Sequence, residues 1–183
     1  MDEAAVNSIY FARPGPENTA RTLEIARGRA DELGVQAVLV ASTRGATGVR
    51  AAEVFRGHNL IVVTHAAGFR EPNGQELDEA GRLAITAAGA RLLTCQHAFG
   101  GVGRAVRRKL QTYELEEIIA YTLRQWGGEG VKVAVEIAVM AADAGLIPTD
   151  QEVIALGGTG RGAELGVLLR GPAGEVLGAG GWW

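Results

Sequence analysis

The feature that most constrains the fold is an apolar strand that runs directly into a helix. Residues 35–41 form an unbroken apolar run with the length and β-branched content of a strand that is buried on both faces. From about residue 46 onward, small and apolar residues recur at the spacing of a helix. Strands covered on both faces occur mainly in parallel sheets with helices packed against them, so this segment favours an α/β fold.

The turn between this strand and helix carries the first functional signal. Residues 42–47 read Ser-Thr-Arg-Gly-Ala-Thr, which places three hydroxyl groups, one guanidinium group and one glycine at the start of a helix. The free N–H groups and the positive dipole end of a helix N-terminus suit a phosphate. Serine and threonine are also ordinary N-cap residues, so the turn alone leaves phosphate binding and plain capping open.

The rest of the chain continues the alternation of strands and helices. We expect strands at residues 7–12, 35–41, 59–64, 90–94, 152–156 and 165–169, and helices at residues 16–33, 46–56, 76–88, 113–126 and 131–144. Three glycines weaken a helix at residues 98–110, which therefore stay ambiguous. Residues 131–144 are apolar nearly all round, as is typical of a buried helix. Without an internal repeat or linker, residues 1–183 are expected to form one domain.

Composition and charge narrow the classes of function. A net charge of −3 gives no electrostatic reason to expect nucleic-acid binding, and the basic cluster at residues 104–109 is interpreted as a solvated helix face. No apolar stretch reaches membrane-spanning length and no signal peptide opens the chain, so we expect no membrane association. A single cysteine, Cys95, offers no disulfide framework and fits a cytoplasmic protein. The histidine and cysteine spacing predicts no metal site.

Polar, glycine-bearing segments follow several of the expected strands. They are residues 42–45, 64–65, 94–97 and 157–162, whereas the opposite strand ends are plain. Ligands of open α/β sheets bind beyond the carboxyl ends of the strands, where the strand order reverses. The asymmetry therefore predicts a binding site at one rim of the sheet, and the hydroxyl-rich turn indicates a phosphorylated small molecule.

The same segments resemble those of a known family. The motifs that carry the resemblance are residues 10–11 with 14–19, 40–43 with Gly45, 63–65 with Gly68-Phe69, 135–138 with 140–147, and 157–163. They are similar to a stand-alone prokaryotic family with the fold of the pyruvate kinase C-terminal domain. The resemblance implies a three-layer α/β/α sandwich with a mixed, mostly parallel sheet of order 3-2-1-4-5 and an antiparallel last strand. The 42–47 turn and the 157–162 loop would then face each other across one crevice.

The resemblance also implies a ligand. In pyruvate kinase, the hydroxyl-rich turn of this domain holds a phosphate of an allosteric sugar bisphosphate, and members of the stand-alone family look like flavin mononucleotide (FMN) binders of unassigned activity. Pyruvate kinase chemistry resides in a (β/α)8 barrel of about 250 residues. This chain has no room for such a barrel, so we do not expect pyruvate kinase activity. Two departures affect the site: Gly48 stands where alanine is expected, and Glu164-Leu165 where an Asp-Thr pair is expected.

The candidate ligand-binding residues come from the turn and from three loops. We expect Ser42, Thr43, Gly45 and Thr47 to hold the phosphate, while Arg44 either closes on it or points into solvent. The opposite wall is expected to consist of Gly158, Thr159, Gly160, Arg161 and Gly162. Further candidates are His65, Gly68 and Phe69, the last for stacking on a flat ring.

Structural roles compete with several of these assignments. A histidine such as His65 or His97 more commonly hydrogen-bonds a neighbouring loop than acts as a general base. Phe69 more commonly belongs to the core. Glu136, with Lys132 one turn earlier, is interpreted as one member of an i,i+4 ion pair.

Three functions follow from these observations. The first is a cytoplasmic protein that binds FMN or a similar phosphorylated compound, and the second is a flavin-dependent oxidoreductase. The third is a regulatory module that senses a sugar phosphate or nucleotide and signals through the interface of a homo-oligomer. The sequence contains no recognisable arrangement of catalytic residues, so whether the chain is an enzyme stays open.

Overall fold

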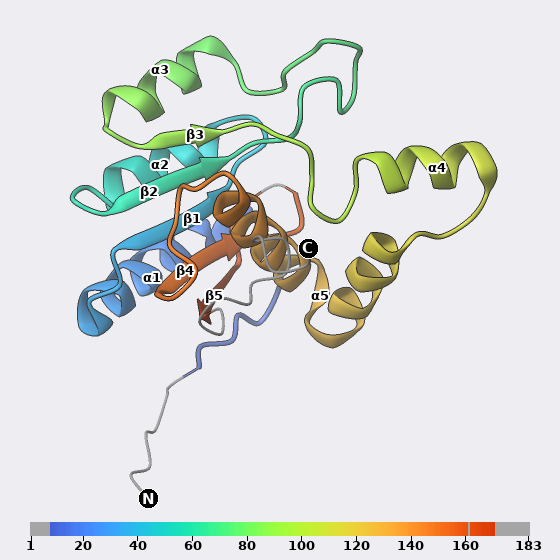
Figure 1. The fold of residues 1–183 in the computed structure, drawn as a ribbon. Coiled ribbons are helices and arrows are strands. Elements are labelled where there is room, and N and C mark those ends of the chain that lie inside the picture. Colours follow the sequence, from blue (N-terminus) through green and yellow to red (C-terminus); the bar gives the residue numbers. More distant parts are fainter. Residues whose placement is uncertain (1–7, 161, 171–183) are drawn as a thin grey trace, which may run out of the picture.

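Five strands form one sheet of order β3-β2-β1-β4-β5 in the computed structural model, which describes residues 8–160 and 162–170 (Figure 1). The strands are β1 (Ala37–Ala41), β2 (Asn59–Val63), β3 (Arg91–Leu93), β4 (Glu152–Gly157) and β5 (Leu165–Arg170). The β2–β3, β1–β2 and β1–β4 pairs are parallel, and only β4–β5 is antiparallel. This confirms the expected strand order and the expected antiparallel last strand.

Helices cover both faces of the sheet. One face packs against α1 (Thr19–Leu33), α2 (Ala46–Val54) and α3 (Glu79–Ala87), and the other packs against the C-terminal half of α5 (Leu115–Asp143). Alternate residues of each strand serve the two layers: Val38 and Val40 lie in the first core cluster, and Ala37 and Leu39 in the second. Burial on both faces explains why the central strands are unbroken apolar runs.

The register of the parallel strands brings their polar ends together. Ala41 pairs with Val63, and Val40 pairs with Leu156, so β1, β2 and β4 end at one edge of the sheet. The strand order reverses between β1 and β4, which makes this edge the expected binding rim.

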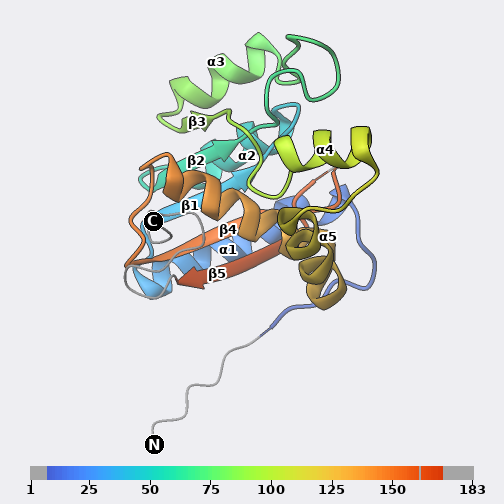
Figure 2. The same cartoon turned by 45° about the vertical axis from the view of Figure 1, so that its right-hand side comes forward.

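The two helices expected at residues 113–126 and 131–144 form one helical span, α5, with a break at Gly128 (φ 78°, ψ −178°). Before the break, α5 pairs with α4 (Val102–Leu110) to form a helical hairpin, residues 102–127, that projects away from the sheet (Figures 1 and 2). After the break, the helix lies on the sheet. The ambiguous 98–110 segment is therefore helical from Val102 onward, and most of its glycines precede the helix.

One prediction about the N-terminal part of the chain is wrong. Residues 8–12 form neither a strand nor a helix, and Tyr10 is 90% exposed; residue 7 lies outside the described residues. Asn18 occupies the N-cap position of α1 but makes no capping hydrogen bond. Its side chain donates instead to the carbonyl of Arg13 (2.7 Å), while the Thr19 hydroxyl accepts the N–H of Ala163 (3.1 Å).

Candidate functional site

A crevice of about 750 Å³ opens at the expected rim of the sheet. Its walls come from the 42–47 turn, the loop after β2, the loop after β4 and the C-terminal half of α5. Most of the predicted site residues line it together: Ser42, Thr43, Arg44, Thr47, His65, Gly158, Thr159, Gly160 and Gly162. Arg161 lies outside the described residues. Gly45 is buried behind the lining, while Gly68 and Phe69 line a neighbouring hollow.

The 42–47 turn presents the start of α2 to the crevice. Gly45 is the N-cap residue with φ 100°, a conformation that favours glycine, and Ala46 and Thr47 begin the helix at the crevice wall. The buried Ser42 hydroxyl accepts the N–H of Gly48 (3.0 Å), so Ser42 does perform the capping role left open by the sequence. The other N–H groups of the first turn have no partner within the helix and can face an anion.

Gly48 is explained by the packing beneath this turn. A Cβ atom at this position would lie 2.8 Å from both Ile85 of α3 and Val62 of β2, and 3.3 Å from the Cβ of Ser42. The two distances of 2.8 Å are shorter than real Cβ contacts, so the expected alanine would require Ile85, Val62 or α2 to shift. Glycine at residue 48 thus allows α2 to pack closely against α3 and β2.

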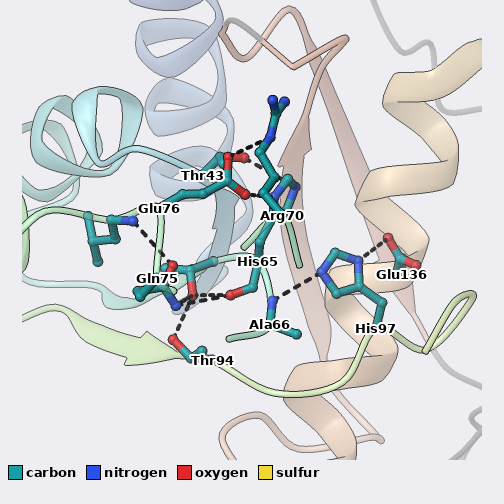
Figure 3. Close-up of polar contacts among 11 residues, drawn as sticks. Thr43, His65, Ala66, Arg70, Gln75, Glu76, Thr94, His97 and Glu136 are labelled. Atoms are coloured by element: carbon teal, nitrogen blue, oxygen red, sulfur yellow. Dashed lines mark hydrogen bonds and ion pairs between the residues drawn. The ribbon is translucent and has the colours of Figure 1, made fainter. Parts of the chain in front are cut away.

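A chain of polar contacts runs along one side of the crevice (Figure 3). The Thr43 hydroxyl lies 3.3 Å from Nε2 of His65, and Nδ1 of His65 lies 2.6 Å from Oε2 of Glu76. The other carboxylate oxygen of Glu76 pairs with Nε of Arg70 (3.0 Å). With Nδ1 donating its hydrogen to the carboxylate, Nε2 of a neutral imidazole can accept the hydrogen of a hydroxyl group. This is the order of groups in which a carboxylate orients a base beside a hydroxyl.

Sequence reasoning missed Glu76 and Arg70. Both lie in the loop between β2 and α3, where no hydrophobic period fixes the direction of a side chain. The loop is held by Gln75, whose amide donates to the carbonyl of His65 (3.1 Å). The one signal for Glu76 in the sequence was its position at the end of a loop that begins with a candidate site residue, His65.

Glu136 is a buried carboxylate at the back of the crevice. It accepts the ammonium hydrogen of Lys132 (2.6 Å) and the N–H of Phe99 (3.1 Å), and His97 Nδ1 lies 3.7 Å away (Figure 3). Burial raises the pKa of Glu136, but the interaction with His97 and the charge of Lys132 outweigh it and lower the pKa to about 2. The predicted i,i+4 pair is confirmed. His97 also accepts the N–H of Ala66 (3.3 Å), so it has the structural, loop-binding role.

The carboxylate of Glu164 holds the loop after β4 closed. Glu164 Oε1 accepts the N–H of Thr159 (3.0 Å) and also the Thr159 hydroxyl. Glu164 is the residue at which the family resemblance led us to expect aspartate, and here it takes up both donors of Thr159. The backbone of Gly158 and Gly162 approaches so closely that a Cβ atom on Gly158 would lie 2.1 Å from the carbonyl of Gly162.

Phe69 does not face the crevice. Its ring stacks on His97 at 5.1 Å and 20°, lies 4.1 Å from the ring of His65, and is covered by the guanidinium of Arg104 at 4.7 Å. The structure thus places Gly68 and Phe69 in the neighbouring hollow, although the ring of Phe69 contacts that of His65 at the crevice wall.

Two further features of the described residues bear on ligands and membranes. Within residues 8–160 and 162–170, no group of three histidine, cysteine, aspartate or glutamate side chains could hold a metal ion. Among the helices of this part of the chain, none is both long enough and apolar enough to cross a membrane.

The fold and crevice define an α/β domain of the pyruvate kinase C-terminal type. The chain belongs to the family described as "Pyruvate kinase, alpha/beta domain", whose family model matches residues 20–166. Two crystal structures of pyruvate kinase from Cryptosporidium parvum are similar at 16% sequence identity, with TM-scores of 0.43 and 0.45. Each match covers 84% of this chain and 22% of that chain, so the chain spans about a fifth of the length of these enzymes. A structure of O-ureido-L-serine synthase matches 54% of this chain and 32% of its own, at 18% identity and a TM-score of 0.31.

Proposed function

We propose that this chain binds a phosphorylated small molecule, FMN, in the crevice, with the phosphate at the 42–47 turn. The observation that carries the proposal is that the N-terminal turn of α2, with the hydroxyls of Thr43 and Thr47, opens into the crevice that the 158–162 loop also lines. Helix N-termini with hydroxyl side chains are favourable anion sites. A volume of about 750 Å³ lies within the range of small-molecule sites.

The remaining walls suit the rest of such a ligand. The side that α5 contributes includes three apolar residues, Val133, Ile137 and Met140, which offer a surface for a flat ring, together with Glu129 and Glu136. Arg44 lines the polar side and supplies positive charge for a phosphate, whereas Arg70 is paired with Glu76. Thr159 is the weakest of the proposed contacts, because Glu164 occupies both of its donors.

The first experiment is a visible absorption titration of the purified protein with FMN. A shifted flavin spectrum that saturates at micromolar ligand would support the proposal. Unchanged spectra would remove FMN as the ligand, and the same protein would then be titrated with sugar phosphates and other nucleotides by calorimetry.

A double variant tests the phosphate turn itself. Thr43→Val with Thr47→Val should weaken binding by about 1–3 kcal/mol for each buried hydrogen bond lost. Thr86→Val is the matched control, because the Thr86 hydroxyl bonds a carbonyl within exposed α3, away from the crevice. Equal affinities in the double variant and the control would contradict the assignment of the turn.

A flavin-dependent oxidoreductase is the second candidate, and the Thr43–His65–Glu76 contacts favour it. Bound flavin would supply a hydride acceptor. Nε2 of His65 would take the proton from a substrate hydroxyl, and Glu76 would stabilise the resulting imidazolium. His65→Asn should then abolish flavin reduction by small hydroxy acids under anaerobic conditions even when the protein is saturated with FMN. Equal reduction rates in the variant and the native protein would exclude this role.

The third candidate, a regulatory module, is favoured by the helical hairpin. In the first half of α5, Leu115, Ile118, Tyr121 and Trp126 are exposed and fall within an arc of about 140° at 100° per residue. No charged residue lies in this arc, as is typical of the cores of homodimer interfaces. We therefore assign a second copy of this chain as its partner.

The exposed apolar area of the hairpin is large enough for an interface with a second copy of the chain. Val102, Leu110 and Tyr113 also lie exposed on the hairpin. The seven side chains are about two thirds exposed on average, so at roughly 200 Å² for a fully exposed large apolar side chain the hairpin offers on the order of 900 Å², close to what each partner of a stable complex buries. Tyr121→Glu should convert a dimer to a monomer in analytical ultracentrifugation, while Leu83→Glu on α3, an equally exposed position, should not. A native monomer at all concentrations, with or without FMN, would exclude this candidate.

A further inference from the structure

A second hollow of about 520 Å³ lies beside the crevice, between α4 and the loops that follow β2 and β3. Its lining includes the small residues 66–68 together with Cys95 and Gln96. His97 lines both cavities and separates them. None of the functions proposed above uses this hollow.

Two arginines give the hollow a positive charge. Arg104 and Arg108 are four residues apart on α4, so they lie on one face of the helix, and both line the hollow. Among the described residues neither has a carboxylate partner, and no acidic side chain lines the hollow. Arg107, which lies between them in the sequence, pairs instead with Glu117 (2.6 Å). Two unneutralised guanidinium groups in a concave surface create a local positive potential on a chain whose net charge is −3.

The position of Arg104 is fixed by stacking. Its guanidinium carbon lies 4.7 Å from the centre of the Phe69 ring. The Phe69 ring stacks in turn on the ring of His97, with 5.1 Å between the ring centres. His97 is held by its hydrogen bond from Ala66 and by its contact with Glu136. A guanidinium that stacks through its face keeps its N–H edges free for a ligand. The stack therefore orders a cation before any ligand arrives, which reduces the entropy lost on binding.

We propose that the second hollow is a binding site for an oxyanion, a phosphate or a carboxylate group, held by Arg104 and Arg108. Arginine recognises both groups through paired N–H···O hydrogen bonds. The oxyanion belongs either to a free small molecule or to the far end of the ligand that occupies the crevice. The site does not depend on the identity of the crevice ligand, because it shares only His97 with the crevice lining.

The chain carries its own reporter for this site. Cys95 lines the hollow and is the only cysteine in the sequence. Alkylation by iodoacetamide, which is uncharged, can therefore be followed at one position by mass spectrometry. The reaction is run at mildly alkaline pH, because burial and the nearby charge of Asp143 raise the pKa of the Cys95 thiol. Asp143 does not itself line the hollow.

The experiment measures how inorganic phosphate, pyrophosphate and citrate change the alkylation rate of Cys95. Each anion should slow the alkylation of Cys95 in the native protein severalfold, and this protection should saturate as the anion concentration rises. The double variant Arg104→Gln with Arg108→Gln should lose the protection. Lys109→Gln, which removes a neighbouring charge of the same sign on the same helix, should retain it. Arg108→Gln alone should raise the anion concentration needed for half-protection about tenfold. Because Arg108 is exposed, this single variant should fold normally, so it tests the site even if the double variant does not fold.

Further outcomes decide the source of the anion and the validity of the site. If FMN protects Cys95 in native protein but not in Thr43→Val with Thr47→Val, while phosphate protects both, one ligand reaches from the crevice into the hollow. If phosphate alone protects, the hollow takes a separate molecule. Equal rates with and without every anion would overturn the proposal, as would protection that persists in the double arginine variant. Stronger protection by short duplex DNA than by phosphate or pyrophosphate would replace it with nucleic-acid binding.

Discussion

The two halves of α5 both carry large apolar side chains but lie in opposite environments. After the break at Gly128, Ala134, Ile137 and Met140 are buried against the sheet. Before the break, Leu115, Ile118, Tyr121 and Trp126 are exposed, and Trp126 reaches 81% exposure. Apolar content alone thus does not decide burial. The second half has a sheet to cover, whereas the first half has only α4, which lies on its other side (Figure 2).

The charged residues sharpen the contrast. The buried half contains the Lys132–Glu136 pair, which is 5% and 4% exposed. The surface pair that spans the break, Arg124–Glu129, is 39% and 38% exposed. Buried pairs cost much when one partner is lost, because the remaining charge has no water to solvate it.

The largest expected effect comes from breaking the buried pair. Glu136→Ala leaves the Lys132 ammonium and the N–H of Phe99 without their acceptor, so we expect a loss of about 3–5 kcal/mol in the free energy of unfolding. Urea denaturation measures it. Glu129→Ala, in the surface pair, should cost no more than about 1 kcal/mol. Similar losses in the two variants would show that the burial of Glu136 has no energetic consequence.

Acid titration should reveal the same carboxylate. Its pKa is lowered from 4.5 to about 2 in the folded protein, so its contribution is fully present above pH 4.5 and disappears as the pH falls toward 2. The shift corresponds to about 3 kcal/mol. The unfolding free energy of the native protein should therefore fall more steeply below pH 4.5 than that of Glu136→Gln. Parallel pH profiles would contradict the lowered pKa.

The break between the halves gives the next effect. Gly128 has a φ and ψ combination that is nearly confined to glycine, so Gly128→Ala should destabilise the protein by about 1–3 kcal/mol although the space around it is open. Gly28→Ala is the control, because Gly28 is also unobstructed but lies within α1 with an ordinary helical φ. It should stabilise by about 0.5–1 kcal/mol. Thermal melts compare the two, and stabilisation by both substitutions would place Gly128 in a regular helix.

The smallest effect on stability is expected from the exposed half. Trp126→Ser should change the unfolding free energy of the monomer by no more than about 0.5 kcal/mol, because the side chain has few intramolecular contacts to lose. The measurement belongs at a protein concentration at which ultracentrifugation finds a monomer. A loss above 1 kcal/mol would mean that Trp126 packs within its own chain.

These contrasts show what the sequence could predict. The buried half of α5 followed from a segment that is apolar nearly all round, and the strand order followed from the family resemblance, because both depend on long segments. The convergence of Thr43 and His65 followed from strand ends that meet at one edge. Glu76 and Arg104 could not be found in this way, since each is positioned by a loop or by a projecting helix. The basic cluster of α4 was interpreted as solvated, yet two of its arginines line a hollow.

The loop after β4, one lip of the crevice, is fastened to the beginning of the fold. Ala163 donates to Thr19, 144 residues earlier in the chain, and Gly162 lies against Pro16 with no room for a side chain. On a ribosome, the 42–47 turn therefore emerges long before the segment that faces it, and domains complete their folding only when such distant contacts form. A phosphorylated ligand would have no closed crevice to enter on the nascent chain until β4 is made. Its stabilising effect would then act on the completed domain rather than guide the early steps of folding.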